Sequence, residues 1–174
     1  MEIERLFKES REYEKAKKLY DSAFPDNEKG VFENMFLDEV VSQKYVFYEN
    51  GVFCGFVCLF VYLDIAHIIY LAVDDSLRGK GYGTKMLKNI AEMYAEYRIV
   101  ADLERPDEDS YNYEHRLRRR AFYVRNGYEK TEISYEWQGE NYDIYAYNGM
   151  VSKKEFRDFW DYIDEVKEGA LRGF

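Results

Sequence analysis

The segment best suited to chemistry lies between an apolar run and a helix-like pattern, from Leu71 to Thr84. It holds three glycines on alternate positions: Gly79, Gly81 and Gly83. Three basic residues flank them: Arg78, Lys80 and Lys85. Glycine lets backbone approach a ligand closely, and the free N–H groups at a helix start bind anions. The segment predicts a site for a phosphate-bearing ligand, with a turn that uses glycine only for geometry as the alternative.

Two familiar phosphate loops do not fit this spacing. The P-loop requires four residues between its glycines, followed by Lys and Ser or Thr, whereas the gaps here are single residues. The dinucleotide pattern requires a third glycine where this chain has Thr84 or Met86. A different class of phosphate loop is therefore expected.

The elements that must position this loop follow from hydrophobic periodicity. The expected helices are Glu9–Ala23, about Asn27–Val40 (with Val31, Met35 and Phe36 inward), Gly81–Tyr97, Tyr113–Arg125 and Val151–Lys167 (with Phe156, Phe159, Trp160 and Ile163 inward). The expected strands are Ile3–Phe7, Lys44–Tyr48, Val52–Tyr62, Ala66–Val73, Arg98–Glu104, Ile133–Trp137 and Tyr142–Tyr147. Asn50-Gly51 indicates a hairpin between the second and third strands.

The order of these elements, β-α-α-β-β-β-α-β-α-β-β-α, predicts the α/β fold class. A strand–helix–strand unit around residues 66–104 implies one parallel pair, and the hairpins imply antiparallel strands beside it. We expect a mixed sheet with helices on both faces. The 174 residues contain no repeat or linker, so residues 1–174 are expected to form a single domain.

The amino-acid composition limits the classes of molecule that this protein is expected to bind. The chain has 34 Asp and Glu against 25 Lys and Arg, a formal charge of −9, which disfavours nucleic acid and anionic membranes as partners. There is no apolar run long enough to span a bilayer and no secretion signal at the start, so a soluble, cytoplasmic protein is expected. Cys54 and Cys58 are too far apart along one strand to bridge, which favours buried free thiols, and the remote His67 and His115 give no metal spacing.

Two motifs together resemble the GNAT family of N-acetyltransferases. The first is Arg78-x-x-Gly81-x-Gly83, which follows a strand and opens a helix. The second is Arg120-Ala-Phe-Tyr-Val-Arg-Asn-Gly-Tyr128, which is similar to the late helix and turn of that family. The order of elements also matches. The resemblance covers nearly the whole chain and implies a GNAT-like sheet splayed at its central parallel pair.

The resemblance implies that acetyl-CoA is the acetyl donor and that no metal takes part. The backbone amides from Arg78 to Thr84 would hold the CoA pyrophosphate, and Leu71 to Val73 would pair with the pantetheine arm, with the Val73 amide facing the thioester carbonyl. The implied cofactor-binding residues are Leu71, Ala72, Val73, Arg78, Gly79, Lys80, Gly81, Tyr82, Gly83 and Thr84.

The resemblance also implies catalytic residues. Tyr123 falls at the position of the family's acid, where a phenol would give its proton to the departing thiolate; a core tyrosine is the alternative. Glu104, at the end of a strand, is the preferred base, with a structural ion pair to nearby arginines as the alternative. Asp102, on the same face of that strand, is the second choice. Some relatives need no dedicated base.

One position departs from the family pattern. Many relatives carry Asn seven residues before the tyrosine, where this chain has Arg116, and Asn112 lies one helical turn earlier. The basic run Arg116, Arg118, Arg119 and Arg120 could reach a CoA phosphate. The favoured reading is a solvated helix face paired with three acidic residues: Asp107, Glu108 and Asp109.

The leading functional hypothesis is an acetyl-CoA-dependent N-acetyltransferase that acts on a primary amine of a small molecule or peptide. The alternative is a CoA-binding or regulatory module without turnover, for which a retained Tyr123 has no evident use. The acidic chain weakly favours cationic amines, although salt screens this beyond about 8 Å. The identity of the amine stays open, as does pairing with a second copy as a homodimer.

Overall fold

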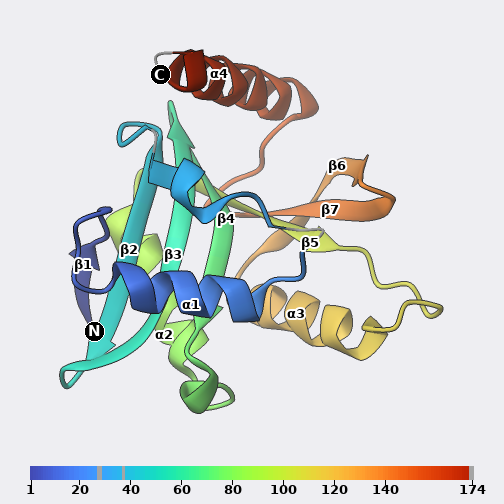
Figure 1. The fold of residues 1–174 in the computed structure, drawn as a ribbon. Helices are drawn as coiled ribbons and strands as arrows, with labels where there is room; N and C mark the ends of the chain where they lie inside the picture. The colour runs from blue at the N-terminus through green and yellow to red at the C-terminus, as the bar shows by residue number, and fades with distance from the viewer. Residues whose placement is uncertain (27–28, 37, 173–174) are drawn as a thin grey trace.

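A seven-stranded sheet in the order β1-β2-β3-β4-β5-β7-β6 forms the centre of the molecule (Figure 1). The structure, a computed structural model, describes residues 1–26, 29–36 and 38–172. The strands are β1 (Glu2–Arg5), β2 (Ser42–Glu49), β3 (Val52–Tyr62), β4 (Ile65–Val73), β5 (Arg98–Glu104), β6 (Glu129–Trp137) and β7 (Glu140–Tyr147). β4 and β5 pair in parallel, and the other neighbours pair antiparallel. The predicted mixed, mostly antiparallel sheet is confirmed.

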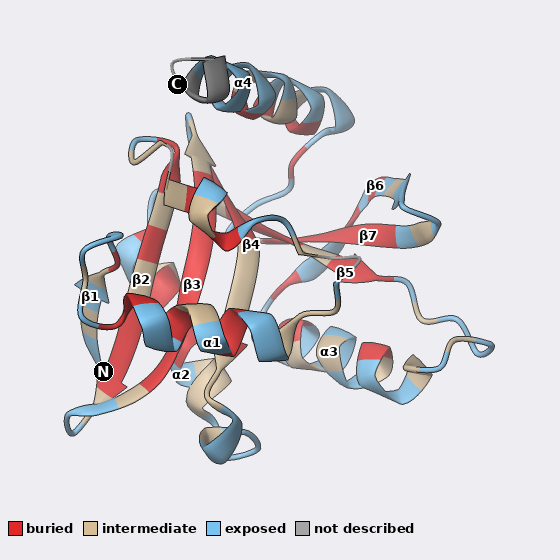
Figure 2. Cartoon of the chain, viewed as in Figure 1, coloured by how far each residue is buried: buried red, intermediate tan, exposed pale blue. Residues whose placement is uncertain are grey.

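Helices cover both faces of the sheet, as predicted. They are α1 (Tyr13–Ala23), α2 (Tyr82–Met93), α3 (Tyr113–Arg125) and α4 (Lys153–Arg172), with short 3₁₀ turns η1 (Phe32–Phe36) and η2 (Asp75–Leu77). Tyr20 of α1 and Phe159 of α4 belong to one buried cluster, whereas Ile90 of α2 and Tyr123 of α3 belong to a second. Figure 2 shows the central strands buried between these helices.

Two tight turns close the β2–β3 and β6–β7 hairpins. Asn50 and Gly51 have φ of 53° and 74°, and Gln138 and Gly139 have φ of 49° and 80°. Positive φ at both central residues defines a turn whose twist matches that of the flanking strands. The hairpin predicted from Asn50-Gly51 is confirmed.

The predicted second helix is wrong. Its expected start at Asn27 lies outside the described residues, and from Phe32 to Phe36 the chain forms only a 3₁₀ turn. The Met35 carbonyl, which an α-helix would use, accepts hydrogen bonds from Lys44 Nζ and Ser42 Oγ instead, both at 2.8 Å. Val31, expected inward, is 59% exposed, whereas Met35 is buried as predicted.

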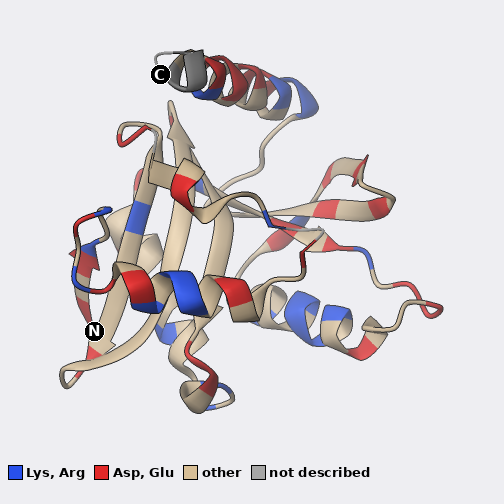
Figure 3. Ribbon diagram, viewed as in Figure 1, with Lys and Arg blue, Asp and Glu red and all other residues tan. Residues whose placement is uncertain are grey.

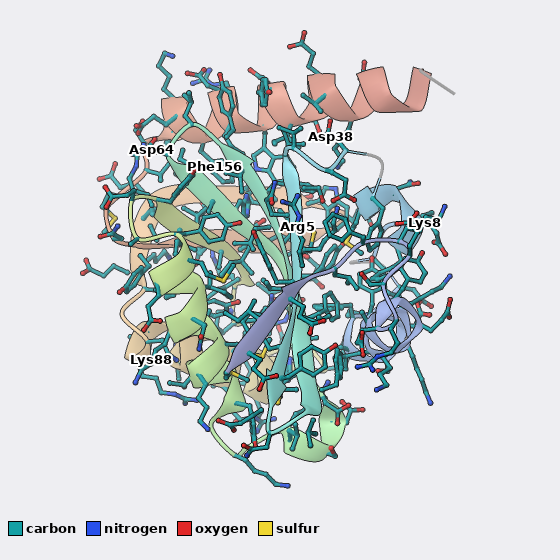
Figure 4. All side chains as sticks on the ribbon, turned by 90° about the vertical axis from the view of Figure 1, so that its left-hand side faces the viewer. Arg5, Lys8, Asp38, Asp64, Lys88 and Phe156 are labelled. Atoms are coloured by element: carbon teal, nitrogen blue, oxygen red, sulfur yellow. The ribbon has the colours of Figure 1, made fainter. Side chains whose placement is uncertain are left out.

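The other helices differ from expectation mainly at their ends. α2 stops at Met93 instead of Tyr97, because Tyr94 leaves the helical conformation, with φ of −116° and ψ of 39°. In α4, Phe156, Phe159 and Ile163 are buried as predicted, and Trp160 is half-buried. Figure 4, which labels Phe156, shows α4 lying across one end of the sheet.

Both cysteines are free and buried, as predicted. Burial raises the pKa of the Cys58 thiol to about 11, so this thiol stays protonated. No helix within residues 1–26, 29–36 and 38–172 has the length and apolar character needed to cross a membrane. The same part of the chain brings together no group of three or more His, Cys, Asp or Glu side chains that could hold a metal ion.

Candidate active site

The parallel strands β4 and β5 separate partway along their length and form a fork. Their pairing runs from Ile65 opposite Arg98 to Ile68 opposite Ala101 and then ends. Beyond it, residues 70–73 of β4 and 102–104 of β5 pair with the strand on their outer side. The facing edges therefore present backbone N–H and C=O groups that an extended ligand can pair with.

The β4 side of the fork keeps its shape through a close contact with β3. Leu71, Ala72 and Val73 pair with Val57, Phe56 and Gly55. At Gly55, with φ of 156°, a Cβ atom would lie 2.1 Å from the Ala72 carbonyl oxygen. Only glycine permits this approach, so β3 fixes the position of the predicted pantetheine-binding residues.

The glycine loop, residues 78–84, follows the open end of β4. Gly79 and Gly81 have φ of 74° and 83°, and Gly81 caps the start of α2. No atom lies within 4 Å of where a Cβ would stand on either residue. The N–H groups in the first turn of α2 have no acceptor within the helix, and the helix dipole is positive there. This loop is suited to a phosphate group.

Charge around the loop is more balanced than the sequence indicates. Arg78 Nη2 lies 2.7 Å from Asp75, and Lys85 Nζ lies 2.6 Å from Glu49. Lys80 Nζ donates to the Ser76 carbonyl at 2.9 Å. Lys80 is thus the one of the three basic residues that forms no ion pair with a carboxylate of the described chain.

The structure brings the two sequence motifs into contact. A Cβ on Gly83 would lie 3.1 Å from the ring of Phe122, so α2 and α3 meet closely at this glycine. Asn126, at the end of α3, donates to the Phe122 carbonyl at 2.7 Å and to Thr84 Oγ1 at 3.4 Å. The end of α3 therefore supports the start of α2, and Tyr123 follows Phe122 directly.

Tyr123 is buried with 3% of its surface exposed. Burial is the largest influence on its phenol and raises its pKa, while Arg119 opposes this and the negative charge of Asp102 adds to it. The phenol therefore keeps its proton at neutral pH. This is the protonation state that a proton donor to a thiolate requires.

Glu104 and Arg116 form a buried ion pair on the β5 side. Their exposures are 5% and 3%, and Arg116 Nη2 lies 3.1 Å from Glu104 Oε1. Arg116 also pairs with Glu140 at 2.9 Å and donates to Asn112 Oδ1 at 2.7 Å. Arg116 is therefore not on the solvated face predicted for it, because three acceptors on the strands and loop draw it inward.

The remaining arginines of the run are less buried. Arg118 and Arg120 are exposed and Arg119 is half-buried. Figure 3 shows α3 as a largely basic helix. Within the described residues these arginines make no ion pair with the predicted acidic partners, of which Asp107 accepts the N–H of Asp109 in a local turn. That predicted pairing is wrong.

Asp102 has two partners that sequence reasoning missed. Its Oδ1 lies 2.6 Å from His67 Nε2, and its Oδ2 accepts the Tyr135 hydroxyl at 2.5 Å. His67 is fully buried on β4, and Tyr135 is half-buried on β6. The only available sequence signal was a lone polar residue in the apolar run of residues 66–73, which does not name its partner.

Comparisons with known proteins agree with this geometry. The family profile described as Acetyltransferase (GNAT) domain matches residues 41–130, which is more than half of the chain. No curated protein sequence matches. The chain belongs to the GNAT acetyltransferase family.

Solved structures of this family share the fold. A GNAT-family protein from Bacteroides thetaiotaomicron is 19% identical with a TM-score of 0.76, over 91% of this chain and 93% of that one. An aminoglycoside 6'-N-acetyltransferase from Enterococcus faecium is 15% identical with a TM-score of 0.64, over 84% and 96%. A GNAT-family acetyltransferase from Elizabethkingia anophelis with acetyl-CoA bound is 13% identical with a TM-score of 0.58, over 84% and 96%. At these identities the likeness shows the fold alone.

Proposed function

We propose that this protein is an acetyl-CoA-dependent N-acetyltransferase that transfers the acetyl group to a primary amine by direct attack on the thioester. The observation that carries the proposal is the fork between β4 and β5, whose open edges end at the amide-rich start of α2. One surface thus offers an extended edge for the pantetheine arm and an anion site for the pyrophosphate. The relatives solved with acetyl-CoA and named as aminoglycoside acetyltransferases support this assignment.

The residues on the β4 side bind and orient the donor. Leu71 to Val73 present the backbone edge, and the Val73 amide is proposed to stabilise the oxyanion that forms when the amine attacks. The amides of residues 78–84 hold the phosphates, with Arg78 and Lys80 at the rim. Acetyl-CoA supplies the activated acetyl group when bound, and the chain supplies position and protons.

Tyr123 is proposed as the acid that protonates the departing thiolate. It lies in α3 directly after the residue that packs on Gly83, so the same contact that fixes the start of α2 fixes the phenol. Its raised pKa keeps the proton available. General acid catalysis of this kind contributes about 100- to 10,000-fold to rate.

Two carboxylates on β5 compete for the role of base. Glu104, the preferred residue from sequence, is tied by one carboxylate oxygen to the buried guanidinium of Arg116. Asp102 makes no such ion pair with Arg or Lys in the described part of the chain, where its partners are His67 and the Tyr135 hydroxyl. This difference favours Asp102.

The test is a panel of amines with detection of free thiol, together with calorimetry of acetyl-CoA binding. We expect acetyl-CoA to bind and at least one primary amine to release CoA thiol faster than hydrolysis does. Binding without thiol release for any amine would favour the non-catalytic CoA-binding module. Absence of binding would overturn both. Including small-molecule amines and peptides with free amines in the panel would report the substrate class in the same experiment.

A further inference from the structure

Asp102 lies where the fork opens. Ala101 is the last residue of β5 that pairs with β4, so Asp102 is the first residue beyond the pairing. Its side chain is 22% exposed. Its negative charge also raises the pKa of the Tyr123 phenol. Asp102 therefore lies at the point where the two parallel strands separate.

Both oxygens of Asp102 are fixed by side-chain partners from two other strands. His67 Nε2 lies 2.6 Å from Oδ1, and the Tyr135 hydroxyl lies 2.5 Å from Oδ2. Each carboxylate oxygen accepts two hydrogen bonds, so one acceptor site remains on each. The carboxylate is thus held in place while it keeps capacity for a proton.

The surroundings of His67 favour a proton on Nε2. The ring is fully buried, and Nδ1 has no hydrogen-bond partner among the described residues. A proton on Nδ1 would leave a buried N–H unsatisfied, which costs about 1–3 kcal/mol. With Nε2–H as the donor, Asp102 is held by a hydrogen bond from a buried ring, whereas Glu104 is held by the Arg116 guanidinium.

Helix α4 holds both donors through aromatic packing. The His67 ring centroid lies 5.7 Å from Phe156, 5.7 Å from Phe159 and 5.2 Å from Trp160. Tyr135 stacks on Tyr142 at 5.3 Å and packs on Phe156 at 6.3 Å. Phe156 therefore contacts both partners of Asp102.

We propose that His67 and Tyr135 are positioning residues that hold Asp102 as the base of the reaction. In this arrangement α4 supports both residues through Phe156. The inference rests on the proposed acetyl transfer. An N–H bond of the substrate ammonium breaks and an O–H bond forms on Asp102. The freed lone pair attacks the thioester carbon, the C–S bond breaks, and Tyr123 protonates the sulfur. The phenolate then takes the second amine proton, and Asp102 releases its proton to water.

Other titrating and charged groups near this set come from two elements. Arg119 of α3 acts on both Tyr123 and Tyr135, and Tyr142 of β7 acts on Tyr135. The side chains of α4 that pack on His67 are the three rings named above. Burial and Asp102 raise the pKa of Tyr135, so its hydroxyl stays a donor across the assay range.

The test compares pH–rate profiles of the full chain. Asp102→Asn should lower kcat at least 100-fold with acetyl-CoA affinity within twofold of wild type. Tyr135→Phe and His67→Leu should each lower kcat about tenfold and move the acidic limb to higher pH, because a donor to the carboxylate is lost. His67→Gln keeps an N–H donor and should recover most of kcat. Tyr162→Phe, a hydroxyl removed from a ring stacked on Tyr62, is the control and should match wild type.

Outcomes separate this inference from the function on which it rests. If wild type acetylates no amine, the proposed function fails, and this inference fails with it. If wild type is active but Asp102→Asn keeps its kcat, or if Tyr135→Phe and His67→Leu leave the profile unchanged, only this inference is overturned. Thermal unfolding of each variant shows whether His67→Leu lost its fold, in which case Tyr135→Phe decides.

Discussion

The two sides of the fork are built from different parts of the chain. On the β4 side, the proposed donor site consists of backbone groups: an open strand edge and a glycine loop within residues 69–84. On the β5 side, the proposed catalytic groups are side chains. Asp102 contacts residues that are 35 and 33 positions away in the sequence. A backbone site is sensitive to local conformation, whereas a side-chain site is sensitive to distant partners. Substitutions on the two sides should therefore fail in different ways.

The largest fall in kcat should come from replacing Tyr123, the proposed proton donor. Tyr123→Phe should lower kcat by about 1,000-fold while acetyl-CoA affinity stays unchanged, because the proton donor is lost and the fold is kept. Steady-state kinetics and calorimetry measure the two quantities. Tyr128→Phe is a matched control, since its buried hydroxyl has no hydrogen-bond partner among the residues that the structure describes and its ring lies 5.1 Å from that of Tyr123. An equal loss in both variants would show that packing, not acid catalysis, is affected.

The glycine loop tests the backbone side alone. Gly81→Val should weaken acetyl-CoA binding about 100-fold, because valine disfavours a φ of 83° and the loop then loses charge-assisted hydrogen bonds of ~1.5–3 kcal/mol each. Calorimetry gives the affinity directly. Gly139→Val changes a glycine of nearly the same φ in the β6–β7 turn and should leave the affinity unchanged. Normal binding by Gly81→Val would mean that the loop does not hold the phosphates.

The ion pair of Glu104 separates structure from catalysis on the β5 side. Glu104→Gln should lower the free energy of unfolding by about 2 kcal/mol, since Arg116 keeps Glu140 but loses one buried counter-charge. Urea unfolding measures this, and kcat should change less than tenfold. Lys130→Gln breaks a more exposed pair with Asp143 and serves as the small-effect control. A large fall in kcat at unchanged stability would make Glu104 the base.

The smallest effect concerns the free energy of unfolding and the attachment of α4, the helix whose Phe156 packs on the partners of Asp102. Hydrogen bonds from Ser152 and then Arg98 lower the pKa of Glu155 from 4.5 to about 2. A carboxylate whose pKa is depressed on folding stabilises the fold above its unfolded pKa. This contribution is lost as pH falls from about 4.5 towards 2.

Because the Glu155 side chain is 44% exposed and water screens its interactions, we expect a loss of only about 0.5 kcal/mol over that range. Urea unfolding at a series of acidic pH values measures it against Glu155→Gln. The variant should lack this part of the pH dependence. Parallel curves for the two proteins would contradict the assignment.

The conformation of the glycine loop on the β4 side could be predicted from the sequence, because it depends on neighbouring residues in the chain. Glycine at alternate positions between a strand and a helix indicates the loop conformation, and Gly79 and Gly81 do adopt positive φ. The strand–helix–strand unit also predicted the parallel pair correctly.

The side-chain half could not be predicted in the same way. Arg116 reads as part of a basic helix face until the fold places Glu104 and Glu140 beside it. His67 reads as a lone histidine until the β4–β5 register puts it opposite Val100, two residues from Asp102. The region after α1 failed for a related reason, since Lys44 on β2 takes a carbonyl that a local helix would have used.

Gly55 shows that the shape of the proposed donor-binding edge depends on a residue that does not line it. It lies on β3, away from the fork, yet any side chain there would collide with the Ala72 carbonyl. In a mutational scan selected for activity, Gly55 should therefore score as intolerant as the glycine loop. A redesign of the proposed donor site for longer acyl groups would have to leave β3 unchanged and vary residues on α2 or α3 instead.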